Sequence, residues 1–553
     1  MGIKLKKNLI FVIVIAAAAT IVYANSFGGK FLWDNRFEIV DNTYIKSFDL
    51  GSIFTHSTTS GAGRESGFYR PLVSLSFAID YKIWGVKPGG FHFTNFLLHI
   101  LSAVLVYFIF NLLYGRRAIS FFTGLLFAIH PIQVETVSYI SGRSDLLSVF
   151  FSLLSIYFFI KQDKNVNKLR RNLFYISSLV SLLLAMLSKE IAVIVPLLLL
   201  LICYFFLKND NRKSFYNLGL RIGLPFVLSV SYSFLRLGVL NFSDGFSTFS
   251  NTNFFARIVI FLKALPVYWQ MLLAPSNLRF RLDNVDSFAN QWYLLVISPV
   301  ILAIIVYFSY LSIKKNRFLV FGFGWFFISL APVSSIILPI NYVLGERWLR
   351  LPAIGLFFLA AIGIQELLKR ISPHKLARSI LYVIIIAYFV LLSFITIKTN
   401  RIWSNSISFY SHLTKYYTYD IDNRLNLAIS YKEAGQKENA LKEYKTIIEH
   451  TEFYIKNEGI VKNSQQLARS YKLLGSLYIE FGQYDKSIFY LEKLRELAPE
   501  DWKPYSLLAQ VYILKGDYKE AAKLLEKVLS IDPGNARAKK YLEMLNAGTI
   551  PSI

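Results

Sequence analysis

The stretch HPIQVETVSYISGRSD, residues 130–145, brings ionisable side chains between two long apolar runs. The short segment Gly345-Glu346-Arg347 does the same much later in the chain. A charge within a membrane or at its edge costs free energy, and it usually marks a functional position. The two segments therefore predict a membrane protein whose polar residues gather in a site.

The composition supports this class of protein and excludes two others. Of the 553 residues, 54% are apolar and only 17% are charged, which is too apolar for a soluble domain of this length. The net charge of +25 could indicate nucleic-acid binding, but acidic and basic residues nearly balance after Asp420. The excess of Lys and Arg lies in short loops between apolar runs, where it sets membrane orientation. We therefore expect no nucleic acid as a partner, and the single cysteine, Cys203, can form no intrachain disulfide.

Apolar runs long enough to cross a bilayer recur through the first 400 residues. The basic clusters between them, such as Lys161 to Arg171, Lys208 to Lys213 and Lys314 to Arg317, fall on one face, which predicts a cytoplasmic N-terminus. We predict an all-α, polytopic bundle of about eleven spans, near residues 8–24, 94–114, 118–130, 146–160, 172–188, 191–207, 214–233, 292–313, 318–336, 347–367 and 379–397.

Two further segments of this membrane domain differ from the spans. Residues 25–93 form a long polar loop on the extracytoplasmic face, and loops of this length tend to carry function. The segment Ala256 to Leu273 contains Arg257, Lys263 and Pro266, and we expect it to be an interfacial or re-entrant helix.

The composition changes after Ile397 to Tyr, Lys and Glu at helical spacing. Gly475 and Ala509 lie 34 residues apart, as do Pro499 and Pro533, and this is the repeat length of tetratricopeptide units. We predict a membrane domain over 1–400, a linker over 401–419 and a repeat domain over 420–546, with about three repeats and a capping helix. The repeat domain is expected outside the cytoplasm.

A series of motifs runs through the chain in a fixed order and resembles one family. The motifs are Asp34, Tyr69-Arg70-Pro71-Leu72, Phe91-His92 with Asn95 and His99, His130-Pro131 with Glu135, Gly142-Arg143 with Asp145, Lys189-Glu190, and Glu346-Arg347 with Pro352. The series is similar to the TMTC family, the transmembrane and tetratricopeptide-repeat proteins of the wider GT-C group of glycosyltransferases. The resemblance implies a GT-C-type fold. It also implies transfer of a sugar, mannose in the eukaryotic relatives, from a polyprenyl-phosphate carrier to protein hydroxyl groups on the extracytoplasmic side.

One position departs from the pattern of that family. Its members carry paired acidic residues in the first outer loop, whereas here Asp34 is followed by Asn35, with Glu38 and Asp41 further on. Two adjacent carboxylates are therefore not present at this position, and one carboxylate can suffice.

The transfer needs a base near the acceptor oxygen and cations near the departing phosphate. We assign Asp34 as the catalytic base; the alternative is a solvated or capping aspartate. We assign Arg347, Lys189 and Arg70 to the donor phosphate; an arginine suits this role because a guanidinium can bind two phosphate oxygens at once. The alternative is internal pairing of Arg347 with Glu346 and of Lys189 with Glu190. For Arg70 the alternative is that Tyr69-Arg70-Pro71 shapes the outer loop.

Six further residues are expected to support the site by positioning the donor or the base: His130, Glu135, Arg143, Asp145, Glu190 and Glu346. We predict no metal site, because His130 and Glu135 lack the i,i+4 spacing that places two ligands on one helical face. A divalent cation is the less favoured alternative. No cofactor is firmly implied, and the lipid-phosphate-linked sugar is the donor substrate.

The repeat domain offers a concave surface for an acceptor polypeptide or a partner protein; the alternative is that it only covers the outer face. Two other functions stay open. One is the same chemistry on a lipid or polysaccharide acceptor, and the other is a non-catalytic membrane scaffold that recruits partners through its repeats. We expect a bacterial cytoplasmic membrane, with the endoplasmic reticulum membrane as the alternative.

Overall fold

The chain folds as two compact units, Met1–Ser408 and Phe409–Ile553. In this computed structural model the described residues are 2–549, apart from 165–166, 207–211, 241, 243–252, 276–277, 279–280, 283–290, 313–316, 338–343, 372, 418–419 and 458–463. The basic clusters at 208–213 and 314–317 thus lie mostly outside the described residues.

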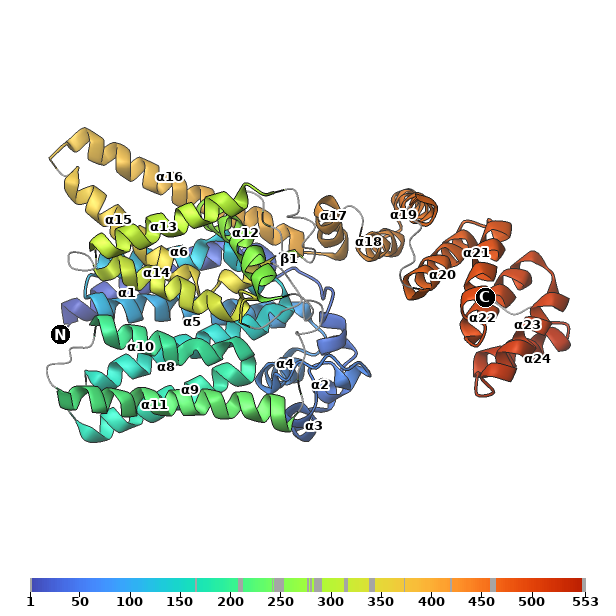
Figure 1. Cartoon of the computed structure of the whole chain (residues 1–553), viewed down its shortest axis with the longest axis horizontal. Coiled ribbons are helices and arrows are strands. Elements are labelled where there is room, and N and C mark those ends of the chain that lie inside the picture. The colour runs from blue at the N-terminus through green and yellow to red at the C-terminus, as the bar shows by residue number, and fades with distance from the viewer. Residues whose placement is uncertain are drawn as a thin grey trace. The chain divides into compact units, whose positions relative to one another are not determined.

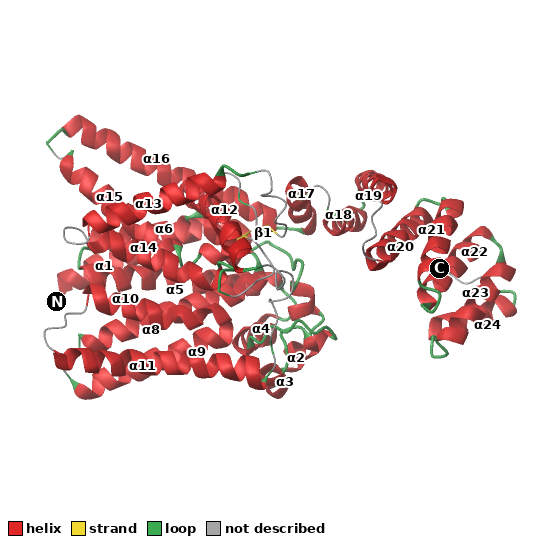
Figure 2. Ribbon diagram, in the orientation of Figure 1, coloured by secondary structure: helices red, strands yellow, loops and turns green. Residues whose placement is uncertain are grey.

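The first unit is a bundle of helices, as predicted (Figure 2). The one pairing of strands among the described residues joins β1 (Arg281–Leu282) to β2 (Leu344–Gly345), antiparallel. The long helices are α1 (Gly2–Tyr23), α5 (Pro88–Tyr114), α6 (Arg117–Ile129), α8 (Arg143–Asp163), α9 (Lys168–Ser188), α10 (Val195–Phe206), α11 (Arg212–Phe234), α12 (Phe254–Leu273), α13 (Leu294–Ser312), α14 (Arg317–Leu330), α15 (Ala353–Arg370) and α16 (Lys375–Asn400).

Local chemistry explains where these helices begin and end. Helix α5 starts at Pro88, whose missing N–H would have no partner in a first turn, and it stops at Gly115 with φ of +73°. Helix α9 begins after Asn167, whose side chain accepts hydrogen bonds from the backbone N–H groups of Leu169 and Arg170.

By length and apolarity, seven helices of the described residues can cross a membrane, or eight if the pair Arg117–Ile129 and Pro131–Ser138, bent by 54°, forms one span. Eleven spans were predicted. The difference arises partly because the apolar runs at 191–207 and 318–336 fold into helices of only 12 and 14 residues, each next to a 3₁₀ turn. At 1.5 Å per residue, such helices fall short of a hydrocarbon core of about 30 Å. The chain is an integral membrane protein.

Helix α12 is the segment that was predicted to be an interfacial or re-entrant helix. It is a continuous helix of 20 residues that contains Pro266 and meets the same criteria of length and apolarity as the other candidate spans.

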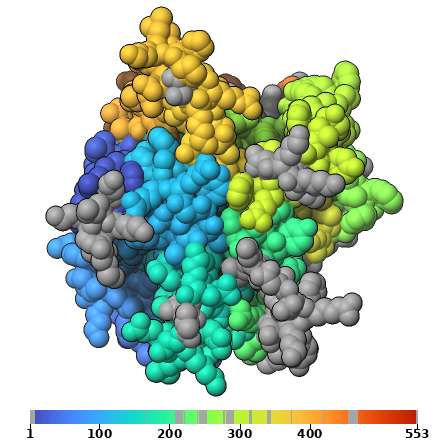
Figure 3. Space-filling view, turned by 90° about the vertical axis from the view of Figure 1, so that its left-hand side faces the viewer, coloured from blue at the N-terminus to red at the C-terminus, as the bar shows by residue number. Residues whose placement is uncertain are grey.

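The first and last helices of this unit pack against each other. Helix α1 contacts α16, and the Asn400 side chain donates hydrogen bonds to the Val22 carbonyl at 2.7 Å and to the Asn25 side-chain oxygen at 2.9 Å. Figure 3 faces the end of the bundle that carries the N-terminus and shows segments from different parts of the chain in one surface. Residues far apart in the sequence are thus brought together.

The outer loop is a folded structure with its own core. It contains α2 (Thr43–Ser47), α3 (Leu50–Thr55) and α4 (Pro71–Trp84), and its buried residues pack against α8 through Leu147. In Figure 1 these helices lie at the right-hand end of the bundle, whereas the N-terminus and the turn between α15 and α16 lie at the left-hand end. The loop therefore covers one end of the bundle. Its core comprises Ile39, Ile45, Ile53, Val73, Phe77, Ala78, Phe91, Ile140 and Leu147.

The second unit contains the predicted repeats. Helix α17 (Ser406–Tyr416) begins in the first unit and ends in the second, and three antiparallel helix pairs and a capping helix follow. Gly475 allows close packing, because a Cβ there would lie 2.5 Å from the Leu491 side chain. The elements are α18 (Ile421–Glu433), α19 (Lys437–Asn457), α20 (Ser464–Glu480), α21 (Tyr484–Leu497), α22 (Trp502–Lys515), α23 (Tyr518–Ile531) and α24 (Ala536–Asn546).

Candidate active site

Asp34 lies on a tight turn between α1 and the helices of the outer loop. Trp33 before it has φ of +51°, which is uncommon for a residue other than glycine. The π-helical turn η2 (Arg36–Val40) follows, and the Asp34 carbonyl accepts the N–H groups of Phe37 and Glu38 at 3.0 and 2.9 Å. Unusual backbone of this kind concentrates at functional sites. The turn holds the half-buried Asp34 side chain in place.

A buried tyrosine that the sequence analysis did not select orients Asp34. The Tyr139 hydroxyl donates to Asp34 Oδ2 at 3.1 Å and accepts the Asp34 backbone N–H at 3.3 Å. The Tyr139 ring stacks with Trp33 and Trp403, with centroid distances of 6.0 and 4.9 Å. Since two tryptophan rings stack with it, the Tyr139 ring is held with its hydroxyl beside the carboxylate.

Asn35 cannot serve as a second acid, and the structure gives it a different role. It is buried, its side-chain oxygen accepts the Leu32 N–H at 2.8 Å, and its side-chain N–H donates to the Ser141 hydroxyl at 2.6 Å. An amide has both a donor and an acceptor, whereas an ionised carboxylate only accepts. Asn35 therefore joins the outer loop to the segment that carries Tyr139.

Glu38 is the acidic residue that accompanies Asp34. It lies on η2, one turn beyond Asp34, and its Oε2 is buried without a hydrogen-bond partner in the described part of the chain. Burial raises the pKa of Glu38 to about 7, Asp34 adds to the increase, and Ser141, Arg70 and Arg347 oppose it. The i,i+4 spacing of Glu38 from Asp34 is the feature of the sequence that could have identified it as the second acidic residue. Asp41 instead forms an exposed ion pair with Arg36 at 2.7 Å.

The raised pKa predicts how stability depends on pH. Between pH 4.5, the usual pKa of a glutamate, and about pH 7, Glu38 keeps a proton in the folded protein that it has released in the unfolded chain. Stability should therefore fall as the pH rises through this window. We expect the melting temperature of Glu38→Gln to fall less than that of the unmodified protein over this range. Asp41→Asn is the control that should keep the original slope; identical slopes for all three proteins would contradict the assignment.

Two of the cations assigned to the donor phosphate, Arg70 and Arg347, lie in ion pairs, and Arg347 does not pair with Glu346. Arg70, at the N-terminus of α4, donates to both oxygens of Glu190, at 2.8 and 3.3 Å. The Arg347 guanidinium lies 3.8 Å from Glu135, which also accepts the Arg347 backbone N–H at 3.1 Å. The pairing of Arg347 is loose, and its side chain remains 29% exposed.

Lys189, the third assigned cation, is held more tightly. Its Nζ lies 2.7 Å from both carboxylate oxygens of Asp145, and both side chains are buried. Asp145 thus positions Lys189 by joining the start of α8 to the end of α9.

His130 and Arg143 form hydrogen bonds that hold neighbouring segments of the bundle together. Ile132 N–H donates to His130 Nδ1 at 3.2 Å, so Nε2 carries the proton toward the Leu272 carbonyl 3.0 Å away. The fully buried Arg143 donates to Asp80 at 2.7 Å, to the Phe91 carbonyl at 2.8 Å and to the Asn95 side chain. These bonds tie α4, α5 and α8 together behind the site.

Glu346 does not pair with Arg347. It is fully buried on the 3₁₀ turn η10 (Glu346–Leu349), and neither carboxylate oxygen has a hydrogen-bond partner in the described residues. Burial, followed by the repulsion of Glu135, raises the pKa of Glu346 well above its usual range, which favours the protonated form. Within the described part of the chain, no group of three or more His, Cys, Asp or Glu side chains is arranged to hold a metal ion.

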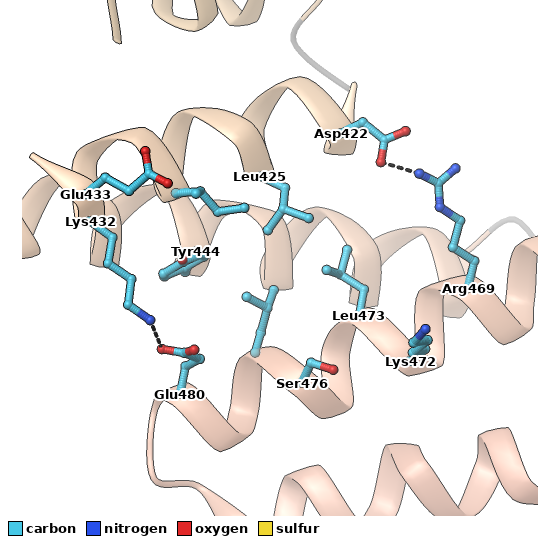
Figure 4. Close-up of a pocket in the computed structure, with 12 residues that line it drawn as sticks. Asp422, Leu425, Lys432, Glu433, Tyr444, Arg469, Lys472, Leu473, Ser476 and Glu480 are labelled. Carbon is cyan, nitrogen blue, oxygen red and sulfur yellow. Dashed lines mark hydrogen bonds and ion pairs between the residues drawn. The ribbon is translucent and has the colours of Figure 1, made fainter. Parts of the chain in front are cut away.

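The second unit has a groove of about 700 Å³ between the first two repeats (Figure 4). Both apolar and charged side chains line it, and the charged ones include two ion pairs: Asp422 with Arg469, and Lys432 with Glu480 at 2.6 Å. The apolar lining comes from α18, α19 and α20, and consists of Leu425, Ile429, Tyr444, Leu473 and Leu477.

Comparison with known families agrees with both units. Residues 70–233 match the model of the dolichyl-phosphate-mannose-protein mannosyltransferases, and residues 422–450 and 478–545 match models of the tetratricopeptide repeat. The chain therefore combines a membrane domain similar to protein O-mannosyltransferases with tetratricopeptide repeats.

Individual proteins show the same similarity along most of this chain. A protein O-mannosyl-transferase of Caenorhabditis elegans is 27% identical, over 73% of this chain and 57% of the relative. The human protein O-mannosyl-transferase TMTC4 is 28% identical, over 66% of this chain and 57% of its own length. Human TMTC1 is 24% identical, over 82% and 56%. The chain is a TMTC-like protein, which confirms the resemblance, and it spans a little over half the length of these relatives.

Proposed function

We propose that this protein is a membrane glycosyltransferase that moves a hexosyl group, mannosyl by its relatives, from a polyprenyl-phosphate carrier to protein hydroxyl groups on the extracytoplasmic side. The observation that carries the proposal is the grouping of Asp34 and Glu38 with cations at the end of the bundle that the outer loop covers. Arg70 and Arg347 are both near enough to Glu38 to lower its pKa against the effect of burial.

The chemistry assigned to these residues is an inverting displacement. Asp34 accepts the proton of the acceptor hydroxyl as that oxygen bonds to C1 of the sugar. The bond between C1 and the phosphate oxygen breaks, and the electron pair leaves with the lipid phosphate, which departs as an anion. Arg347, whose side chain is partly exposed, and Arg70 stabilise this charge. Tyr139 keeps the Asp34 carboxylate oriented.

The repeat unit supports a polypeptide acceptor or partner. Its groove combines an apolar lining with fixed charges of both signs at its sides, a combination that suits an extended peptide with mixed side chains. A lipid or polysaccharide acceptor would leave this groove without a role in the reaction. We place the protein in a bacterial cytoplasmic membrane, with the repeats outside the cytoplasm.

Intact-mass analysis of the extracytoplasmic proteins tests this proposal. Cells that contain the protein should carry proteins heavier by whole hexose units than the same proteins from a deletion strain. Restoring the gene should restore the mass. If no protein changes mass but a lipid or surface polysaccharide does, the protein acceptor is wrong; if nothing changes while partner proteins are lost from the membrane, the protein is a scaffold.

A further inference from the structure

Arg236 is a buried cation next to the site that none of the motifs contains. It lies on η7 (Leu235–Val239), a π-helical turn that directly continues α11, and its side chain is 6% exposed. Its Nε and Nη2 atoms are buried and have no hydrogen-bond partner among the residues that the structure describes. A guanidinium is always charged, and leaving its donors unsatisfied costs free energy.

The nearest anion is already occupied. Arg236 Nη2 lies 3.9 Å from Glu190 Oε2, beyond hydrogen-bond distance, whereas Arg70 donates to both oxygens of the same carboxylate. One carboxylate thus faces two guanidinium groups. This arrangement has a residual positive charge and two directed donors, which is what a phosphate requires.

The structure holds Arg236 in this position from two sides. One turn earlier, the Tyr232 hydroxyl donates to the Met186 carbonyl at 2.8 Å and fixes α11 against α9. Beyond the π turn, the Phe242 N–H donates to the Arg236 carbonyl at 3.0 Å, and the Phe242 ring stacks on Tyr69 at 5.1 Å. Tyr69 precedes Arg70, so the two arginines are linked through neighbouring residues.

The surroundings indicate that the phosphate belongs to a lipid. Phe234 is 70% exposed, and Leu235 and Leu237 are each 44% exposed, so apolar side chains flank the buried guanidinium on its own helix. A free phosphate ion gains nothing from such neighbours, whereas a polyprenyl chain attached to the phosphate can pack on them.

We propose that Arg236 binds the phosphate of the polyprenyl-phosphate donor together with Arg70, with Glu190 holding the two guanidinium groups in register. This inference rests on the proposed function and deepens it by adding a donor-binding residue. Arg236 then meets the phosphate directly, whereas Lys189, held by Asp145, acts behind it.

Binding of a polyprenyl phosphate to the full-length protein in phosphatidylcholine nanodiscs tests the inference without depending on transfer. We expect Arg236→Gln to weaken binding about ten- to a hundredfold, the effect of losing charge-assisted hydrogen bonds. Arg236→Lys keeps the positive charge but loses the planar guanidinium. Its affinity for the polyprenyl phosphate should lie between those of the unmodified protein and Arg236→Gln. Arg221→Gln is the matched control, because Arg221 is on the same helix and pairs with Asp163 at 2.8 Å, away from the site.

Each result of this experiment has a defined meaning. Weaker binding in both Arg236 variants and unchanged binding in Arg221→Gln support the inference, even if no transfer is ever detected. Unchanged binding in the folded Arg236→Lys and Arg236→Gln proteins overturns it. A loss of inorganic phosphate binding with retained polyprenyl-phosphate binding also overturns it, since the anion would then not be the lipid.

Discussion

Replacing Asp34 by asparagine should lower the rate of sugar transfer by roughly a hundred- to ten-thousandfold, the range expected for loss of a general base. The amide keeps the shape of the side chain and can still accept the Tyr139 hydroxyl, so the turn should fold as before. It cannot take the proton of the acceptor hydroxyl. The measurement is transfer of labelled sugar from a polyprenyl-phosphate donor to acceptor protein in reconstituted vesicles.

The matched control for this variant is Asp41→Asn. Asp41 is on the same loop but pairs with the exposed Arg36, so its replacement should leave the rate nearly unchanged. Donor binding should be similar in the unmodified protein and in Asp34→Asn, since the charge that holds the phosphate is elsewhere. A full transfer rate in Asp34→Asn would refute its role as the base.

Replacing Arg143 by alanine should destabilise the membrane unit by about 3–5 kcal/mol, because it leaves Asp80 as a buried charge without its partner. The Phe91 carbonyl and the Asn95 side chain lose a donor at the same time. The amount of folded protein recovered in detergent and its melting temperature measure the effect.

The double variant Arg143→Met, Asp80→Leu separates charge from packing. It removes both charges and keeps apolar volume, and we expect it to recover much of the stability lost in Arg143→Ala. Arg36→Ala removes an exposed arginine and should change the melting temperature little. If Arg143→Ala and the unmodified protein have the same melting temperature, the hydrogen bonds of Arg143 do not stabilise the fold as described.

The sequence indicates the helical bundle and the repeats because both depend on regular patterns. Apolar length predicts membrane helices, and the spacing of Gly475 and Ala509 predicts the repeat. The partners of the charged residues follow from how helices pack, which no local pattern specifies. Lys189 pairs with Asp145 because the end of α9 meets the start of α8, although Glu190 is its neighbour in the chain.

The candidate site divides in the same way. Asp34, Arg70 and Arg347 belong to recognisable motifs, and their assignment to one site stays a prediction. The spacing of Glu38 from Asp34 could suggest that the two residues are neighbours, but the burial of Glu38 on a π-helical turn does not follow from spacing. Tyr139 depends on two tryptophans that are distant in the sequence, so no local pattern selects it. Arg236 is outside every motif, and only its burial without hydrogen-bond partners in the described residues makes it conspicuous.

The stacking of Tyr139 with Trp33 and Trp403 also has a consequence for biosynthesis. Trp33 leaves the ribosome early, whereas Trp403 emerges only after α16 has been made. The ring that contacts Asp34 thus gains its second tryptophan contact only when α16 and the segment after it have been synthesised. A nascent chain that already contains Asp34 and Tyr139 would therefore lack one of the two tryptophan contacts of this ring until that moment.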